Sequence, residues 1–273
     1  MSSGMVKIRE LAGWGLDAYE YRSQTSAFER LAKAKLLVSN RSPFEQPDIL
    51  VPTPEITLDD MFALHAGRPD LLAEMSGLSW SLGIVDLRFL IAFQRRLTFR
   101  SEVPSLSIPA RNDWPALMAL SFGYTRPIEC ELAHDHLTRT VTIRSSNPNL
   151  HIRTTNDAAS PLSIQNSGPF FEVACFRSRW FLRDGYHRAY DLLRAGVFKV
   201  PAVVIQVSNL EDLGAAQSWF FPEEVLFSQT PPHVADFLND DLVIEYERPP
   251  LIKTLRIALE ETLTPATPTG EPS

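Results

Sequence analysis

The stretch that decides the fold is Phe181-Leu-Arg-Asp-Gly-Tyr-His-Arg-Ala-Tyr-Asp-Leu-Leu-Arg-Ala-Gly-Val-Phe-Lys-Val-Pro-Ala-Val-Val204. It predicts a strand, a tight Asp184-Gly185 turn, a short helix and a second strand. Gly196 is a natural stop for the helix, and Val200–Ile205 is typical of a buried strand. One face of the predicted helix is apolar and consists of Ala189, Tyr190, Leu192 and Leu193.

The turn has the chemistry of a phosphate site. Gly185 allows the backbone to approach a ligand closely, and the first N–H groups of the helix have no partner within the helix. These N–H groups lie at the positive end of the helix dipole, where His187 and Arg188 can add charge-assisted hydrogen bonds. Asp184 can cap the helix or help to hold a metal ion that bridges phosphates. Alternatively, Asp184 is only a cap, and His187 and Arg188 are solvated surface residues.

This segment resembles the core of the ParB/sulfiredoxin superfamily. Both consist of a strand, a turn such as Gly-Tyr-His-Arg, a helix, and a second strand that begins with Val-Pro, here Val200-Pro201. In that superfamily the turn binds nucleotide phosphates: ParB proteins bind CTP as a clamp switch, sulfiredoxins use ATP, and a related group phosphorylates free serine. The resemblance implies an α/β (α+β) fold with a ParB/sulfiredoxin-like mixed sheet, and ATP or CTP with Mg²⁺ as cofactor. It also implies a nucleotide site formed by Asp184, Gly185, Tyr186, His187 and Arg188.

Two departures limit what the resemblance implies. Sulfiredoxins carry their nucleophilic Cys at the position of Tyr186, so we do not expect sulfiredoxin chemistry. ParB proteins follow this core with a helical DNA-reading domain, whereas the residues after Val204 predict Pro-rich turns and strands. We therefore expect a nucleotide-phosphate-binding protein that acts as an NTP hydrolase or phosphotransferase. The alternative is a non-catalytic regulatory or interaction module, or a DNA-associated ParB-like protein with a vestigial pocket.

Further candidates could support a phosphate site. Arg177 and Arg179 alternate just before the key strand, where they supplement the phosphate charge or form a solvated hairpin end. Asn147 and Asn149 belong to a loop with strong turn chemistry, which either reaches the nucleotide or simply turns the chain. Glu172 is a candidate general base because it lies close in sequence.

A metal site is not expected. His134 and His136 would share one face of an extended segment near Glu131, but no third ligand follows at a standard spacing. Four arginines are expected on one face of a helix. This basic face is either solvated or forms a surface for nucleic acid or an acidic partner. Its members are Arg88, Arg95, Arg96 and Arg100.

The chain is expected to have three parts. Residues 1–100 form a helical N-terminal region that can recruit a protein partner, with helices within Ile8–Val38 and over Ile84–Arg96. Residues 101–262 form the α/β domain, and residues 263–273 form a disordered tail. Within the α/β domain, two strand pairs are predicted: Glu129–Leu132 with Thr138–Ile143, and Leu242–Glu247 with Leu251–Ile257.

The composition limits which classes of partner and which location are expected. The 273-residue chain has a formal net charge of −7, which disfavours a broad nucleic-acid footprint. No apolar run is long enough for a membrane span, and the first nine residues do not resemble a signal peptide. Cys130 and Cys175 are expected to be reduced core residues, which indicates a cytoplasmic protein.

Overall fold

The computed structural model describes residues 5–22, 27–52, 56–100, 107–123, 128–147, 149–154, 162–166 and 168–263. The tail expected after Leu263 lies outside these residues. Packing divides the chain into two compact units. Unit 1 contains residues 1–125 and 168–250, and unit 2 contains residues 126–167 and 251–273. This division differs from the boundary expected at residue 100, because strands from both sides of that position pair in unit 1.

The central sheet of unit 1 has five strands in the order β10-β9-β11-β3-β2. β11 runs parallel to β9 and antiparallel to β3, so the sheet is mixed. Residues 200–205 of β11 are all buried, as expected for a strand in the middle of a sheet. The strands are β2 (Leu50–Val51), β3 (Ser79–Asp86), β9 (Glu172–Phe176), β10 (Arg179–Asp184) and β11 (Lys199–Gln206).

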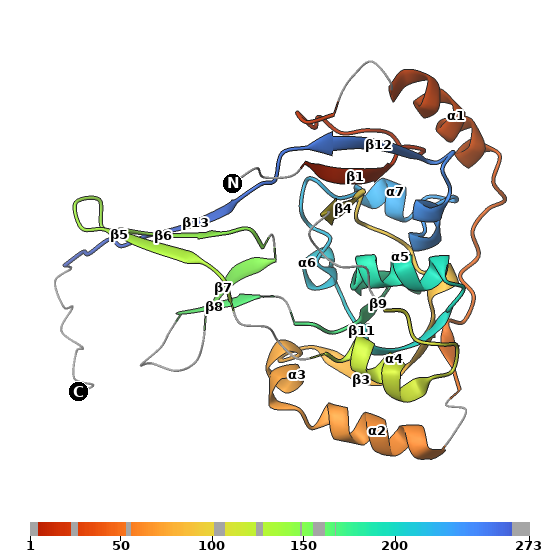
Figure 1. Ribbon diagram of the computed structural model, residues 1–273, viewed down its shortest axis with the longest axis horizontal. Coiled ribbons are helices and arrows are strands. Elements are labelled where there is room, and N and C mark those ends of the chain that lie inside the picture. Colours follow the sequence, from red (N-terminus) through yellow and green to blue (C-terminus); the bar gives the residue numbers. More distant parts are fainter. Residues whose placement is uncertain are drawn as a thin grey trace, which may run out of the picture. The chain divides into compact units, whose positions relative to one another are not determined.

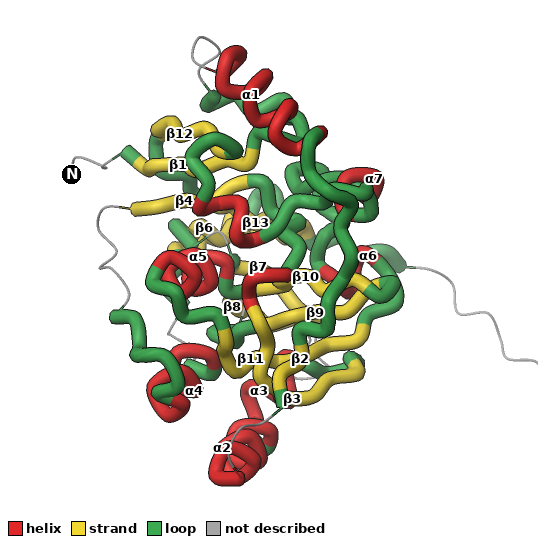
Figure 2. Tube along the Cα trace, turned by 90° about the vertical axis from the view of Figure 1, so that its right-hand side faces the viewer, coloured by secondary structure: helices red, strands yellow, loops and turns green. Residues whose placement is uncertain are grey.

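A second, three-stranded sheet lies at the end of unit 1 opposite α2 (Figures 1 and 2). Its order is β12-β1-β4, so β1 (Val6–Leu11) pairs with a strand on each side. The partners are β4 (Arg96–Arg100) and β12 (Val243–Arg248). α1 (Ala27–Ser39) packs along β12 through a small core that includes Ala34, Val38 and Ile244 (Figure 1).

The other helices of unit 1 are short. Six phenylalanines are almost completely buried in its main core: Phe122, Phe170, Phe171, Phe181, Phe221 and Phe237. The remaining helices are α2 (Ile56–Ala66), α3 (Pro69–Glu74), α4 (Trp114–Ser121), α5 (Tyr186–Arg194), α6 (Leu210–Leu213) and α7 (Glu223–Leu226), with 3₁₀ turns η1 (Leu87–Phe89) and η2 (Val234–Leu238). A mixed α/β fold is therefore confirmed.

The prediction of a mainly helical N-terminal region is wrong. Four strands, β1 to β4, lie within the first 100 residues. The expected helical stretch Ile8–Val38 begins as strand β1, whose side chains are buried at all but one position, and becomes helical only at α1. Burial of β1 between β4 and β12 outweighs its local sequence preference.

The predicted helix over Ile84–Arg96 is also wrong. Its first residues belong to β3, and the Asp86 carboxylate then accepts the Arg88 N–H and starts the single turn η1. The following residues Leu90–Phe93 are extended and buried, with backbone hydrogen bonds to β10 and to the segment around Pro232. The whole segment crosses the core, so residues on all of its sides are apolar. Some of them therefore match the helical spacing by coincidence.

Unit 2 contains a three-stranded sheet, β13-β6-β5, and a two-stranded hairpin, β7-β8. β5 continues to Asp135, beyond the strand end predicted at Leu132, and the turn follows Asp135. The strands are β5 (Glu131–Asp135), β6 (Thr140–Ser145), β7 (Leu150–Thr154), β8 (Leu162–Asn166) and β13 (Lys253–Ala258).

The predicted hairpin between Leu242–Glu247 and Leu251–Ile257 does not form. Both strands exist, but β12 pairs with β1 and β13 pairs with β6. Pro249 and Pro250 between them have no N–H groups to donate to a ladder.

Cys130 was expected in the core and is exposed, whereas Cys175 is half-buried. In the part of the chain that the structure describes, no helix has the length and apolar character needed to cross a bilayer.

Candidate functional site

The Asp184–Arg188 turn has the predicted local structure. β10 ends at Asp184, Gly185 adopts a left-handed conformation with φ of 99°, and α5 begins at Tyr186. A Cβ atom at Gly185 would lie 2.9 Å from Cδ2 of Phe171, so both the dihedral angle and the packing require glycine. The sequence therefore predicted the strand, turn, helix and strand correctly.

Asp184 caps the turn. Its Oδ1 accepts the Gly185 N–H at 2.5 Å, one residue before the helix, and the first N–H groups of α5 have no side-chain cap. Burial raises the pKa of Asp184, although the nearby Arg188 guanidinium acts in the opposite direction. The carboxylate therefore lies where an anionic ligand was expected.

Tyr186 is a buried structural contact. Its hydroxyl oxygen accepts the Phe93 N–H at 3.0 Å and the Gln94 N–H at 3.4 Å. Burial raises the pKa of Tyr186 above its ordinary value, so the hydroxyl stays protonated. This contact fastens the extended segment after η1 to the start of α5.

Arg188 holds three backbone carbonyls from two segments. Nη1 donates to Leu120 O at 3.0 Å and to Pro169 O at 2.5 Å, and Nη2 donates to Phe170 O at 2.7 Å. Burial lowers the pKa of Arg188, with Asp184 and Glu172 opposing that effect. The side chain is thus neither a solvated surface residue nor a set of free donors.

His187 lies at the exposed side of the turn, against β4. Its Nε2 is 2.8 Å from Thr98 O and 3.3 Å from Thr98 N, and its ring packs edge-on to Phe99 at 5.6 Å. Loss of water around the ring lowers the pKa of His187. The neutral form is therefore favoured near neutral pH, and the imidazole adds little positive charge to the turn.

A buried acid group lies beside the turn. Glu172 on β9 is only 3% exposed and pairs directly with Asp184 on β10. Arg183 donates to the Glu172 carboxylate and, through Nε, to Asp212 O at 3.1 Å. Burial raises the pKa of Glu172 to about 7 although Arg183 opposes it, and the charges of Asp184 and Glu74 add to the rise. A carboxyl group that is half-ionised near neutral pH can accept or donate a proton.

The supporting arginines do not lie at the turn, and the supporting asparagines belong to the other unit. Arg177 forms an ion pair with Glu223, and Arg179 donates to Leu226 O and Ser228 O. Arg179 begins β10 and Asp184 ends it, a separation of about 17 Å along the strand. Asn147 and Asn149 belong to unit 2, where the Asn147 side chain accepts the Asn149 N–H.

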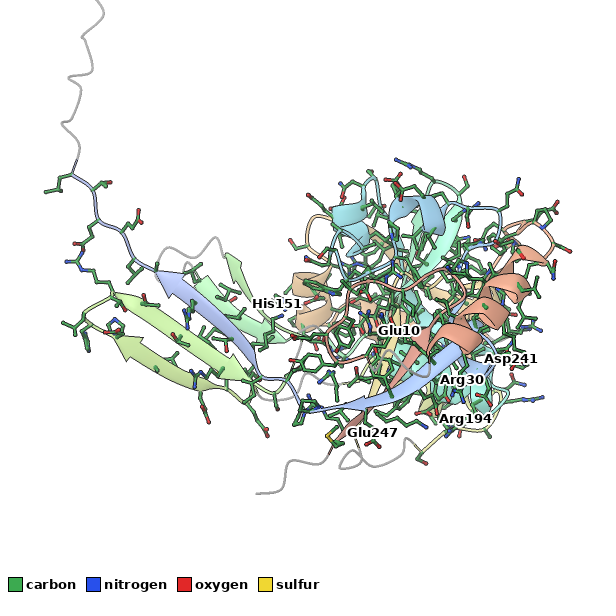
Figure 3. All side chains as sticks on the ribbon, turned by 90° about the horizontal axis from the view of Figure 1, so that it is seen from above. Glu10, Arg30, His151, Arg194, Asp241 and Glu247 are labelled. Carbon is green, nitrogen blue, oxygen red and sulfur yellow. The ribbon has the colours of Figure 1, made fainter. Side chains whose placement is uncertain are left out.

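The expected basic helix face is absent, because these arginines do not lie on a helix. Arg88 pairs with Asp86, while Arg95 is buried and donates to Phe220 O and Gly15 O. Arg96 joins a charged network that the sequence did not reveal. At its centre, the fully buried carboxylate of Glu10 (labelled in Figure 3) accepts from Arg22, Arg96 and Tyr246.

The predicted absence of a metal site concerns His134 and His136. Their rings are 4.1 Å apart on the β5 turn, and Asp135 is engaged with Thr138. Among the described residues, no group of three or more His, Cys, Asp or Glu side chains is arranged to hold an ion.

Two well-formed surface pockets in the described part of unit 1 contain no residue of the turn. One has a volume of about 560 Å³ and lies between β1, α1 and the segment from Asp240 to Glu245. The other has a volume of about 380 Å³ and is lined by Phe44, Glu45, Arg88, Phe89, Thr230 and His233, among others. The sequence analysis singled out only Arg88 from this second pocket.

Comparison with known proteins identified no relative, because no protein-family model, curated protein or solved structure matches this chain. The function must therefore be argued from the geometry of the turn and its surroundings.

Proposed function

We propose that the Asp184–Arg188 turn binds the phosphate groups of a nucleotide, ATP or CTP, and that Asp184 occupies the phosphate position when no nucleotide is bound. The observation that carries this proposal is the 2.5 Å hydrogen bond from the Gly185 N–H to the Asp184 carboxylate at the start of a nine-residue helix. A helix start attracts anions, and here a carboxylate of the chain itself takes that position.

Electrostatics support an exchange of one anion for another. Burial raises the pKa of Asp184, which means that the protein destabilises its charged form. A phosphate group carries more charge and more acceptor oxygens than a carboxylate, so it interacts more strongly with the same donors. Arg183 and Arg188 lie on either side of the Asp184-Gly185 pair in sequence and supply the compensating charge.

Phosphoryl chemistry at this site would rest on Glu172. Its pKa of about 7 suits a group that takes a proton from a water molecule or hydroxyl nucleophile. Mg²⁺ usually binds one or two carboxylates together with phosphates, and Asp184 is the carboxylate of the turn that could bind it. Positioning and charge stabilisation supply most of the catalysis in reactions of this kind.

One observation favours the alternative of a non-catalytic module. The Arg188 guanidinium is already committed to three carbonyls, and no residue of the turn lines either surface pocket. In that case the turn is an internal brace, and binding takes place elsewhere on unit 1.

Thermal melting with ATP, CTP and GTP, each with and without Mg²⁺, tests the proposal on the wild type and on Asp184→Asn. A ligand at 100 times its dissociation constant stabilises the folded state by about 2.7 kcal/mol. Asn keeps an oxygen for the Gly185 N–H but removes the competing charge. We therefore expect a nucleotide shift in the wild type and about tenfold tighter binding by the variant without Mg²⁺.

Asp191→Asn on the same helix is the matched control, because Asp191 lies outside the first turn of α5. It should bind nucleotide like the wild type. Absence of a shift with every nucleotide in both the wild type and Asp184→Asn would refute the phosphate site and leave the internal brace.

A further inference from the structure

The 380 Å³ pocket of unit 1 has rigid, mostly apolar walls. Phe44 packs against His233 with ring centroids 4.7 Å apart, and its N–H donates to Gln229 O at 2.6 Å. On another side, the Arg88 guanidinium lies 5.3 Å from the centre of the Phe89 ring. Three prolines complete the walls: Pro43, Pro47 and Pro231. Walls of this kind suit the aliphatic stem of a long side chain.

The positive charges of the pocket are neutralised by the protein itself. Arg88 donates through Nε and Nη2 to the two carboxylate oxygens of Asp86, at 2.9 and 2.5 Å. Arg41 makes an equivalent two-pronged contact with Asp236, at 2.9 and 2.6 Å. Glu45 is exposed at the pocket and takes part in no ion pair identified among the described residues. The pocket and its bound partners therefore have one negative charge in excess.

His233 forms part of the pocket wall and is held in place by Asp236. Its Nδ1 lies 3.7 Å from the Asp236 carboxylate, which also accepts the His233 N–H at 2.8 Å and is itself held by Arg41. This Nδ1–carboxylate distance is longer than a hydrogen bond, and the His233 side chain instead accepts the Asp236 N–H as part of a capping box. Within the described parts of the chain, Nε2 of His233 has no hydrogen-bond partner, and the side chain lines the pocket.

We propose that this pocket binds the guanidinium group of an arginine side chain presented by an extended peptide of a partner protein. Glu45 forms the charged pair, the Thr230 hydroxyl accepts a further N–H group, and Phe89 contacts the stem. A free amino acid fits less well, because its own carboxylate would meet Glu45. This inference is independent of the nucleotide proposal, since the two sites share no residue.

Fluorescence anisotropy with two labelled peptides tests the inference. One is fluorescein-Ala-Ala-Arg-Ala-Ala, and the other carries citrulline, an uncharged isostere, in place of the arginine. We expect the full chain to bind the arginine peptide at least tenfold more tightly than the citrulline peptide. Glu45→Gln should remove about tenfold of the affinity for the arginine peptide and leave that for the citrulline peptide unchanged.

Glu247→Gln is the matched control, because Glu247 (labelled in Figure 3) is an exposed glutamate on β12 that does not line the pocket. It should bind both peptides like the wild type, which separates a local pair from the net charge of −7. Equal affinities for the two peptides, an unchanged Glu45→Gln variant, or no binding at about 1 mM protein would each overturn the inference.

Discussion

The Asp184–Arg188 turn and the pocket at Glu45 and His233 differ in how their polar groups are used. In the turn, the side chains of Asp184, Tyr186 and Arg188 all bond to the protein itself. In the pocket, Arg41 and Arg88 are paired, whereas Glu45 and Nε2 of His233 have no partner in the described residues. The turn, which the sequence predicted clearly, thus has its polar groups bonded within the protein. The pocket, which the sequence hardly indicated, keeps polar groups that are available to a ligand.

The largest expected effect in this comparison comes from Arg188→Ala. The change leaves the carbonyls of Leu120, Pro169 and Phe170 without their donor in a buried region, so we expect a loss of about 3–5 kcal/mol of unfolding free energy. Urea denaturation measures it directly.

Arg194→Ala in the last turn of the same helix is the control. Arg194 (Figure 3) is 64% exposed in its side chain and lies 3.5 Å from Asp191 and 5.7 Å from the centre of the Tyr190 ring, so the change should cost less than about 1 kcal/mol. A loss below about 1 kcal/mol for Arg188→Ala would mean that the turn is not closed by this residue, and would return it to the surface role considered from the sequence.

A smaller, pH-dependent effect is expected at Glu172. Its pKa is about 7 in the folded protein and near 4.3 in the unfolded chain, so the folded state binds more protons between these values. Stability from this residue is therefore present at low pH and is lost as pH rises from about 4.5 to 7. Glu172→Gln should gain about 1–3 kcal/mol relative to the wild type over this window.

Urea titrations of both proteins at a series of pH values between 4.5 and 8 measure this difference. Taking the difference removes the contributions of other groups, such as Asp86 and Asp70, whose pKa values are lowered by their arginine partners and whose pH dependence has the opposite sign. A difference independent of pH would show that Arg183 keeps Glu172 fully ionised.

The smallest expected effect comes from Glu45→Gln. Because Glu45 is exposed and belongs to no ion pair of the described residues, the unfolding free energy should change by less than about 0.5 kcal/mol. A larger loss would reveal a structural role for Glu45 and would remove the contrast with the turn.

Local patterns were sufficient where one element decided its own structure. The strand, glycine turn, helix and strand of residues 181–204 formed as predicted, because Gly185 is required by its φ of 99° and the apolar face of α5 matches its buried side. The hairpin at Arg177 and Ser178 also formed, with both residues at positive φ.

Patterns failed where distant strands competed for the same residues. β1 and the segment after β3 resembled helices, yet the first pairs with β4 and β12 and the second crosses the core beside β10. β12 and β13 were recognised as strands, but their partners come from β1 and β6, more than a hundred residues away. Pairing of this kind depends on which surfaces can be buried together, which a local window does not contain.

The sequence by itself determined the local structure of the turn, since the residue types, the glycine and the helix start are all adjacent in the chain. Only the tertiary structure decided how those groups are used. It brought Leu120 and Pro169 to Arg188, placed Glu172 opposite Asp184, and assembled Glu45, Arg88 and His233 around one pocket. Burial and partners set the charge and availability of a polar group, and both come from residues far apart in the chain.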